Sequence, residues 1–236
     1  MNFWQITMKR STRLSKSYVI IGTFLTLYGV VISNLMSIIP SIITSELNTP
    51  APIDLTNSFP LLSIALLSFS AVLFALPVIM LFVYDKNNGV LEYLLSTGFD
   101  QLDIFKGYVK ASLVLATYIL VFAIILNTVV GVFLGTSLIL LISIAVLTFT
   151  IGISEVFLVS VCMMAFSSLQ RTPMGANQPL GVIVGVIPMF PALILPLVFP
   201  TYAILIDLTM AAITLLASII LLLSTSRLIL REKLLP

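Results

Sequence analysis

The chain has 236 residues, of which 60% are hydrophobic and 8% charged, and its formal net charge is +2. A soluble domain has roughly a quarter of its residues charged, so this composition predicts that lipid surrounds most of the chain. The sequence contains no histidine, the commonest general base and metal ligand, and its one cysteine, Cys162, forms neither an internal disulfide nor a cysteine-rich metal site. A membrane-embedded enzyme is therefore disfavoured, and we expect no catalytic residue and no metal site.

Residues 1–17 are too polar to cross a bilayer. Their apolar side chains, such as Phe3 and Trp4, stand beside a cluster of lysine and arginine, which is typical of a short helix lying on a membrane surface. A disordered basic tail that only orients the first span is the alternative. The apolar run that follows is too long for the core of a signal peptide, so we expect a retained first span.

Six apolar runs follow, each long enough to cross a hydrocarbon core about 30 Å thick as a helix. They cover residues 18–39, 60–84, 108–134, 138–166, 179–199 and 202–226. The sequence therefore predicts an all-α, polytopic membrane protein whose 236 residues form a single transmembrane domain with six spans.

The basic residues predict the orientation of these spans. If the N-terminus is cytoplasmic, all 11 lysine and arginine residues fall on the cytoplasmic side. The connections on the opposite side, at 40–59 and 135–137, carry none. By the positive-inside rule, this distribution predicts a multi-pass protein of the cell membrane with both termini in the cytoplasm.

The cytoplasmic connection at 85–107 has a pattern that a plain linker would not need. Three helix-breaking residues end the second span: Asn87, Asn88 and Gly89. Residues 90–96 then place three leucines on one helical face: Leu91, Leu94 and Leu95. Thr97 and Gly98 are expected to form a turn, and Asp100 to cap the next helix with Asp103 in its first turn. The result is a short amphipathic helix between two spans.

An apolar face near water needs a partner, which for this short helix could be a neighbouring span, a cytoplasmic protein or the membrane surface. The stretch from Asn88 to Thr97 resembles the G-[ST]-[LM]-E-x-L-L-x-[ST]-P signature of type-2 ABC transporter permeases. Six residues match it directly: Gly89, Leu91, Glu92, Leu94, Leu95 and Thr97. Gly107 resembles a glycine that follows the signature in that family. Three residues depart from the pattern: Val90, Gly98 and Tyr108.

The resemblance implies a non-catalytic permease subunit, and the missing platform for a binding protein favours an exporter. In that family the short helix docks into a cleft of a separate ATPase. The residues assigned to ATPase coupling by this resemblance are Leu91, Glu92, Tyr93, Leu94, Leu95 and Asp100. This chain has no GxxxxGK[ST] loop, so ATP and Mg²⁺ are expected in the partner subunits and no cofactor in this chain.

The expected partners are cytoplasmic ABC ATPase subunits, a second permease copy or a homologue, and membrane lipid, with no nucleic acid. A permease similar to the haem exporters is an alternative within the same class. An ATP-independent secondary transporter or a channel-like protein is the alternative from another class, although the sequence shows no inverted repeat that would favour it.

Polar residues inside the predicted spans are candidates for a pathway or gate. Glu155 lies in the fourth run, where no lysine or arginine is at comparable depth and an ionised carboxylate facing lipid is costly. Either Glu155 and Asn127 contribute to a pathway, or Glu155 is a packing residue hydrogen-bonded to serine, threonine or Asn127 of neighbouring helices.

Four prolines interrupt the fifth run: Pro188, Pro191, Pro196 and Pro200. Each removes a backbone donor, so this segment cannot be a straight helix. The resemblance implies a bent span that leads into short re-entrant helices, and a kinked span with a proline-rich exit loop is the alternative. With a kinked span and an exit loop, Asp207 is expected near the outer interface.

Overall fold

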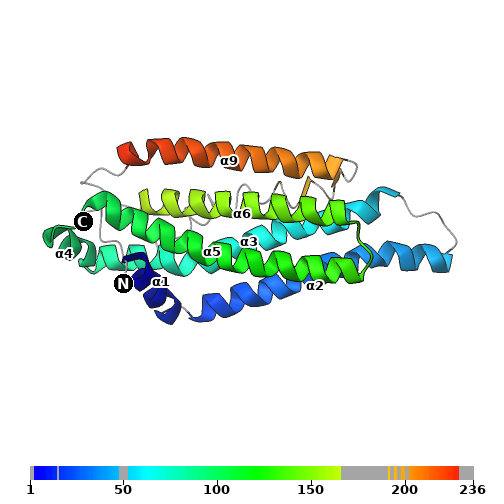
Figure 1. Cartoon of the computed structure of the whole chain (residues 1–236), viewed down its shortest axis with the longest axis horizontal. Helices are drawn as coiled ribbons and strands as arrows, with labels where there is room; N and C mark the ends of the chain where they lie inside the picture. Colours follow the sequence, from blue (N-terminus) through cyan, green and yellow to red (C-terminus); the bar gives the residue numbers. More distant parts are fainter. Residues whose placement is uncertain are drawn as a thin grey trace.

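The computed structural model describes residues 3–14, 16–47, 53–165 and 202–228, together with residues 191, 194–195 and 198–199. Within these ranges the chain is helical and contains no strand, which confirms the all-α prediction there. The helices shown in Figure 1 are α1 (Phe3–Leu14), α2 (Lys16–Leu47), α3 (Ile53–Asn87), α4 (Val90–Ser96), α5 (Gln101–Phe133), α6 (Leu138–Ala165) and α9 (Ala203–Leu228).

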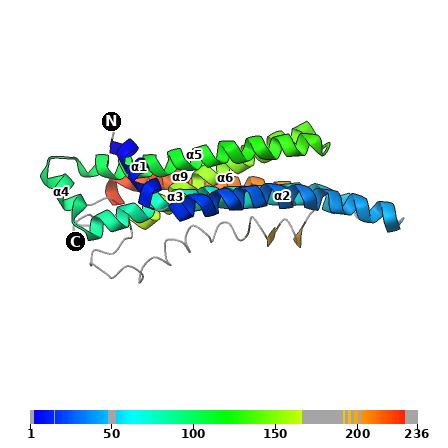
Figure 2. The same cartoon turned by 90° about the horizontal axis from the view of Figure 1, so that it is seen from below.

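The long helices lie side by side in one elongated bundle (Figures 1 and 2). Helix α3 packs against α2, α5 and α6, and α9 packs mainly on α6. Alanine and serine recur along α3, for example at Ala71, Ala75 and Ser68, all with no exposed surface. Because small side chains let helix backbones approach closely without a hydrophobic driving force, they suit a central helix in a lipid-embedded bundle.

Among the described residues, four helical segments are long and apolar enough to cross a membrane: Ser63–Asn87, Gln101–Phe133, Leu138–Met164 and Ala203–Ser224. They coincide with the second, third, fourth and sixth predicted runs. Within α2, the first run contributes a shorter apolar segment, Val19–Val31. The described part of the chain is thus all-helical and suited to a membrane. The fifth predicted span, including Pro188, Pro196 and Pro200, lies outside the described residues apart from isolated positions such as Pro191.

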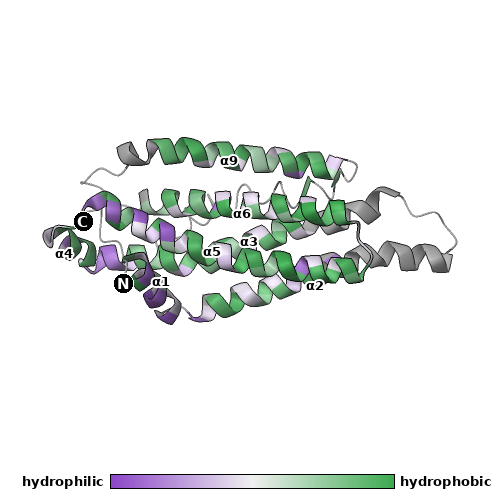
Figure 3. Ribbon diagram, viewed as in Figure 1, coloured by the Kyte–Doolittle hydropathy of each residue, from purple (hydrophilic) through white to green (hydrophobic). Residues whose placement is uncertain are grey.

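One end of the bundle is polar and carries both short helices, and we call it the α1–α4 end. Figure 3 shows hydrophilic residues gathered on α1 and on the neighbouring parts of α3 and α5, whereas the bodies of the long helices are hydrophobic. The predicted N-terminal helix is confirmed as α1, in place of the alternative of a disordered basic tail. Helix α1 packs on α5 and α3, so it is seated on the protein itself.

The short helix predicted at 90–96 is also confirmed, as α4. Gly89 before it and Gly98 after it have φ of +73° and +91°, a left-handed conformation that glycine adopts without steric cost. Asp100 occupies the N-cap position of α5, but its side chain makes no capping hydrogen bond. Its backbone carbonyl instead accepts from the amides of Asp103 and Ile104, both at 3.1 Å. The expected side-chain cap was therefore wrong, because the exposed carboxylate is left to water.

Candidate functional site

Helix α4 connects α3 to α5 and turns its leucine face into the bundle. Leu91 is 1% exposed and belongs to the same buried cluster as Phe82 and Ile104, from α3 and α5. Leu94 and Leu95 are half-buried and pack against that cluster. The three leucines that the sequence assigned to ATPase coupling therefore contact the base of the long helices, and they hold α4 in place.

The opposite side of α4 and the turn after it are exposed. Tyr93 is 67% exposed, and residues 96–100 are all exposed. Backbone hydrogen bonds close this turn: Thr97 N–H donates to Tyr93 O at 3.0 Å and Phe99 N–H to Leu94 O at 3.2 Å. We call Tyr93 and residues 96–100 the α4 surface. It presents two aromatic rings and the Asp100 carboxylate on an ordered backbone, with half-buried Glu92 in the first turn of the helix.

A polar triad around the buried Asp85 carboxylate joins α1, α3 and α5 beneath α4. The Arg10 guanidinium donates through Nη2 to Asp85 Oδ1 at 2.7 Å and through Nη1 to Asp85 Oδ2 at 2.9 Å. The Tyr108 hydroxyl donates to Asp85 Oδ2 at 2.6 Å. Asp85 has no exposed surface. A bidentate hydrogen bond from a guanidinium group compensates well for the lost hydration of a buried carboxylate. The triad therefore fixes α1 on the ends of α3 and α5.

Aromatic side chains also hold α1 against α5 and the α4 surface. The Phe3 ring meets the Tyr108 ring edge-on with centroids 5.6 Å apart, and it lies 6.2 Å from the Phe99 ring of the α4 surface. A Cβ on Gly107 would come within 2.3 Å of Phe3 Cδ1, so Phe3 occupies the space that only glycine leaves open. On the next turn of α5, Lys110 Nζ lies 5.2 Å from the centre of the Trp4 ring.

Sequence reasoning missed this triad. From the sequence, Arg10 is only one of the basic residues that set the orientation, and Tyr108 is only a departure from the permease signature. The available signal was Asp85 itself, an acidic residue at the end of an apolar span. Its partner is 75 positions away in the chain, so the pairing needed the tertiary structure.

Asn127 and Glu155, the two predicted pathway residues, have different surroundings. Asn127 is buried and accepts a hydrogen bond at 2.9 Å from Nδ2 of Asn34, which also donates to Val30 O at 2.7 Å. Asn34, in α2, was not among the predicted residues. The side-chain oxygen of Asn127 thus accepts its hydrogen bond from Asn34 of α2, and not from Glu155, which lies in α6.

Glu155 and Asp207 are buried carboxyls with unmet hydrogen-bonding capacity, and we call them the α6–α9 carboxyls. Glu155 is 2% exposed, and its Oε2 has no hydrogen-bond partner among the described residues. Asp207 has no exposed surface, and in the same part of the chain neither of its oxygens has a partner. In the alternative that makes Glu155 a hydrogen-bonded packing residue, its Oε2 still lacks a partner among the described residues.

Asp207 lies near the start of α9, but its side chain is buried within the bundle. Ala203 and Ala211, four residues before and after it, are buried in one cluster with Ile64 of α3 and Ile144 of α6. Since residues four apart share one helical face, this register turns Asp207 toward the bundle. The hydroxyl of Thr148 in α6 is a further buried group without a hydrogen-bond partner in the described ranges.

Within the residues that the structure describes, no three histidine, cysteine, aspartate or glutamate side chains gather as a metal site would require. Comparison with protein-family models, with curated proteins and with solved structures found no significant match. The function is therefore inferred from the α4 surface, the triad and the α6–α9 carboxyls.

Proposed function

We propose that this chain is the permease subunit of an ABC transporter that works as an exporter and is driven by separate cytoplasmic ATPase subunits. The observation that carries the proposal is the construction of α4. Leu91 is buried in the bundle and Leu94 and Leu95 pack against it half-buried, while the other face of α4 is exposed at the polar end, so the helix is both anchored and accessible to a partner.

The packing of α4 suits a coupling helix. Leu91 shares a buried cluster with α3 and α5, and α4 is joined to both by short turns. A displacement applied to the α4 surface would therefore pass directly to two long helices, which is how a small shift at one site becomes a rigid-body movement. The α1 helix, fixed by Arg10 and Asp85, would move with them as one unit.

The orientation follows from charge. We place the α1–α4 end in the cytoplasm of a cell-membrane protein, because basic residues cluster there and the connection from α5 to α6 carries none. Both termini are then cytoplasmic, and the chain crosses the membrane six times, with residues 179–199 supplying the fifth span. In this arrangement α4 faces the compartment that contains ATP.

The partners follow from the exposed surfaces. The rings of Tyr93 and Phe99, with the carboxylates of Glu92 and Asp100, are the contacts we assign to the ATPase cleft, whose own chain binds ATP and Mg²⁺. The exposed apolar faces of α5 and α9 suit lipid or a second permease copy, with which this subunit would form the pathway. A permease similar to the haem exporters belongs to the same proposal.

Site-specific photocrosslinking tests this proposal. A photoreactive amino acid replaces Tyr93, and as a control it replaces Tyr118, which is 72% exposed in the apolar part of α5. The expected product, in cells irradiated before membrane extraction, is an adduct at position 93 with a soluble protein that contains a Walker ATP-binding motif. The Tyr118 control should give no such adduct. Only lipid adducts at position 93 would contradict the proposal.

A second candidate function is favoured by the α6–α9 carboxyls. Buried acidic residues without partners are found in proton-coupled carriers, where they bind and release the coupling ion. If this chain is such a secondary transporter, the purified chain alone should dissipate a pH gradient across liposomes, measured with an enclosed pH-sensitive dye. Glu155→Gln and Asp207→Asn should each abolish the leak. Liposomes that stay tight would leave the ATPase-driven permease as the only candidate of the two.

A further inference from the structure

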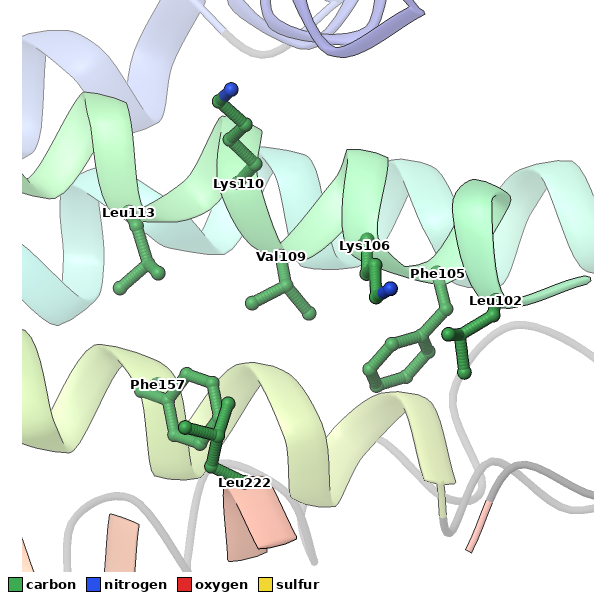
Figure 4. Close-up of a pocket in the computed structure, with 8 residues that line it drawn as sticks. All are labelled: Leu102, Phe105, Lys106, Val109, Lys110, Leu113, Phe157 and Leu222. Atoms are coloured by element: carbon green, nitrogen blue, oxygen red, sulfur yellow. The ribbon is translucent and has the colours of Figure 1, made fainter. Parts of the chain in front are cut away.

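An open groove of about 400 Å³ lies along α5 near the α1–α4 end. Its apolar lining is shown in Figure 4: Leu102, Phe105, Val109 and Leu113 of α5, Phe157 of α6 and Leu222 of α9. From Leu102 to Leu113 the groove follows about 16 Å of helix axis at 1.5 Å per residue. That length is close to half of a hydrocarbon core about 30 Å thick, which is the depth of one leaflet.

One positive charge stands at this groove. Lys106 is exposed, and Figure 4 shows its ammonium group beside the ring of Phe105. Among the described residues no carboxylate lies within ion-pair distance of Lys106. The ammonium group of Lys110, which also lines the groove, turns away from it and lies over Trp4. The groove thus combines a long apolar wall with the Lys106 cation, which has no acidic partner among the residues that the structure describes.

The cation also lies at the depth where a lipid headgroup would be. Lys106 is two residues from Tyr108, whose hydroxyl binds Asp85 in the polar triad, so it stands where the bundle changes from polar to apolar. Leu113 lies farther along α5 from the polar end than Lys106, and Figure 4 shows Phe157 at the same end of the groove as Leu113. The charge of Lys106 at the boundary matches a phospholipid headgroup, and the apolar groove beyond it matches an acyl chain.

We propose that this groove binds an anionic phospholipid of the cytoplasmic leaflet. Its phosphate pairs with Lys106, and one acyl chain lies along Phe105, Val109 and Leu113. Basic pockets between helices on the cytoplasmic side are the sites where proteins hold anionic headgroups. The proposal uses the membrane orientation given above, and it does not depend on an ATPase partner.

A second copy of this chain fits the groove less well. A symmetric contact centred on the groove would bring the Lys106 residues of two copies toward each other, because the same patch is used twice. Like charges facing each other across an interface disfavour it, whereas an anionic headgroup neutralises the same lysine. Charge complementarity therefore selects lipid as the occupant.

Tryptophan quenching by brominated lipid tests this site. The chain has one tryptophan, Trp4, which Trp4→Phe removes, and Leu222→Trp then places a reporter in the groove. The matched control reporter is Leu223→Trp, which is at the same depth on α9 but does not line the groove. Each protein is reconstituted in phosphatidylcholine vesicles that contain either brominated phosphatidylglycerol or brominated phosphatidylcholine.

We expect the reporter at 222 to prefer phosphatidylglycerol about five-fold, the selectivity that one basic residue near a membrane surface supplies. The reporter at 223 should show no preference. Lys106→Gln should remove the preference at 222 and Lys106→Arg should retain it, whereas Lys9→Gln, which changes an exposed lysine of α1, should leave it intact. Because this experiment contains no ATPase, its result is independent of the crosslinking result at Tyr93.

Two outcomes would overturn the proposal. Equal quenching by both lipids at position 222 would mean that the groove has no preference for anionic headgroups. If neither lipid quenched the reporter at 222 while both quenched it at 223, another polypeptide would be covering the groove.

Discussion

The α1–α4 end and the α6–α9 carboxyls show two opposite ways of burying an acidic side chain. Asp85 receives two hydrogen bonds from Arg10 and one from Tyr108, whereas Asp207 is equally buried and receives none from the described residues. Removing a polar group from water is costly unless a partner compensates it. Asp85 is therefore part of the structural framework that supports α4. Burying Asp207 costs desolvation free energy that its described surroundings do not offset. Such an uncompensated buried carboxyl is more usual of a functional residue than of a structural one.

The largest effect is expected from breaking the triad at Arg10. Arg10→Ala leaves the buried Asp85 carboxylate without its charge partner. Such a loss typically lowers the unfolding free energy by about 3–5 kcal/mol. Because the hydrogen bond from Tyr108 remains, we expect a loss of about 3 kcal/mol here. The measurement is the unfolding free energy in mild detergent with increasing denaturant. The double variant Arg10→Met with Asp85→Leu should recover most of the loss. An Arg10→Ala protein as stable as the wild type would show that the pair contributes nothing.

A change of opposite sign is expected at Asp207. Asp207→Leu removes a buried polar group without partners and should raise the unfolding free energy by about 1–3 kcal/mol. The matched control is Asp85→Leu, which removes the acceptor of the triad and should lower it. Both variants are compared in the same denaturation assay. A destabilising Asp207→Leu would mean that Asp207 has a stabilising partner, and the contrast between the two regions would fail.

A smaller effect is expected at Gly107. Gly107→Ala forces the Phe3 ring away from α5, and overfilling a packed contact costs about 1–3 kcal/mol. Because Phe3 is at the start of α1, we expect the lower half of that range and faster proteolysis of the first 14 residues. Phe3→Ala in the same chain removes the clash, so the two changes together should cost less than their sum. Additive losses would contradict the contact.

The smallest effect on stability is expected at the α4 surface. Tyr93→Ala changes a mostly exposed side chain and should alter the unfolding free energy by less than about 0.5 kcal/mol. Leu91→Ala, two residues away but fully buried, is the contrasting variant and should cost about 2–5 kcal/mol. If α4 couples to an ATPase, Tyr93→Ala should nevertheless abolish substrate-stimulated ATP hydrolysis. Normal hydrolysis would remove Tyr93 from the contact.

Much of the local structure was predictable, and the region around α4 shows why. The break at Asn87–Gly89, the helix from Val90 to Ser96 and the turn at Gly98 all depend on preferences of neighbouring residues. The direction of the leucine face was not predictable in the same way. An amphipathic helix needs a partner for its apolar side, but periodicity does not say whether that partner is lipid, another protein or the same chain. Here Leu91 packs on its own bundle.

The candidate site shows the same division. Asn127 and Glu155 stood out in the sequence because polar residues are rare in apolar runs, yet the partner of Asn127 is Asn34, 93 positions away. Asp207 was expected near the outer interface, a statement about depth along the chain. Its burial was decided separately, by the rotation of α9 about its axis that places Ala203 and Ala211 against α6 and α3.

Hydropathy and charge along the chain determined that this protein is helical, that it is suited to a membrane, and which end carries its basic residues. These properties depend on the transfer of each segment from water to lipid, which is additive along the sequence. Tertiary structure alone decided that Arg10, Asp85 and Tyr108 meet and that Asp207 is left without a partner in the described bundle. Pairing depends on how helices distant in sequence rotate and pack against one another, and no local pattern records that.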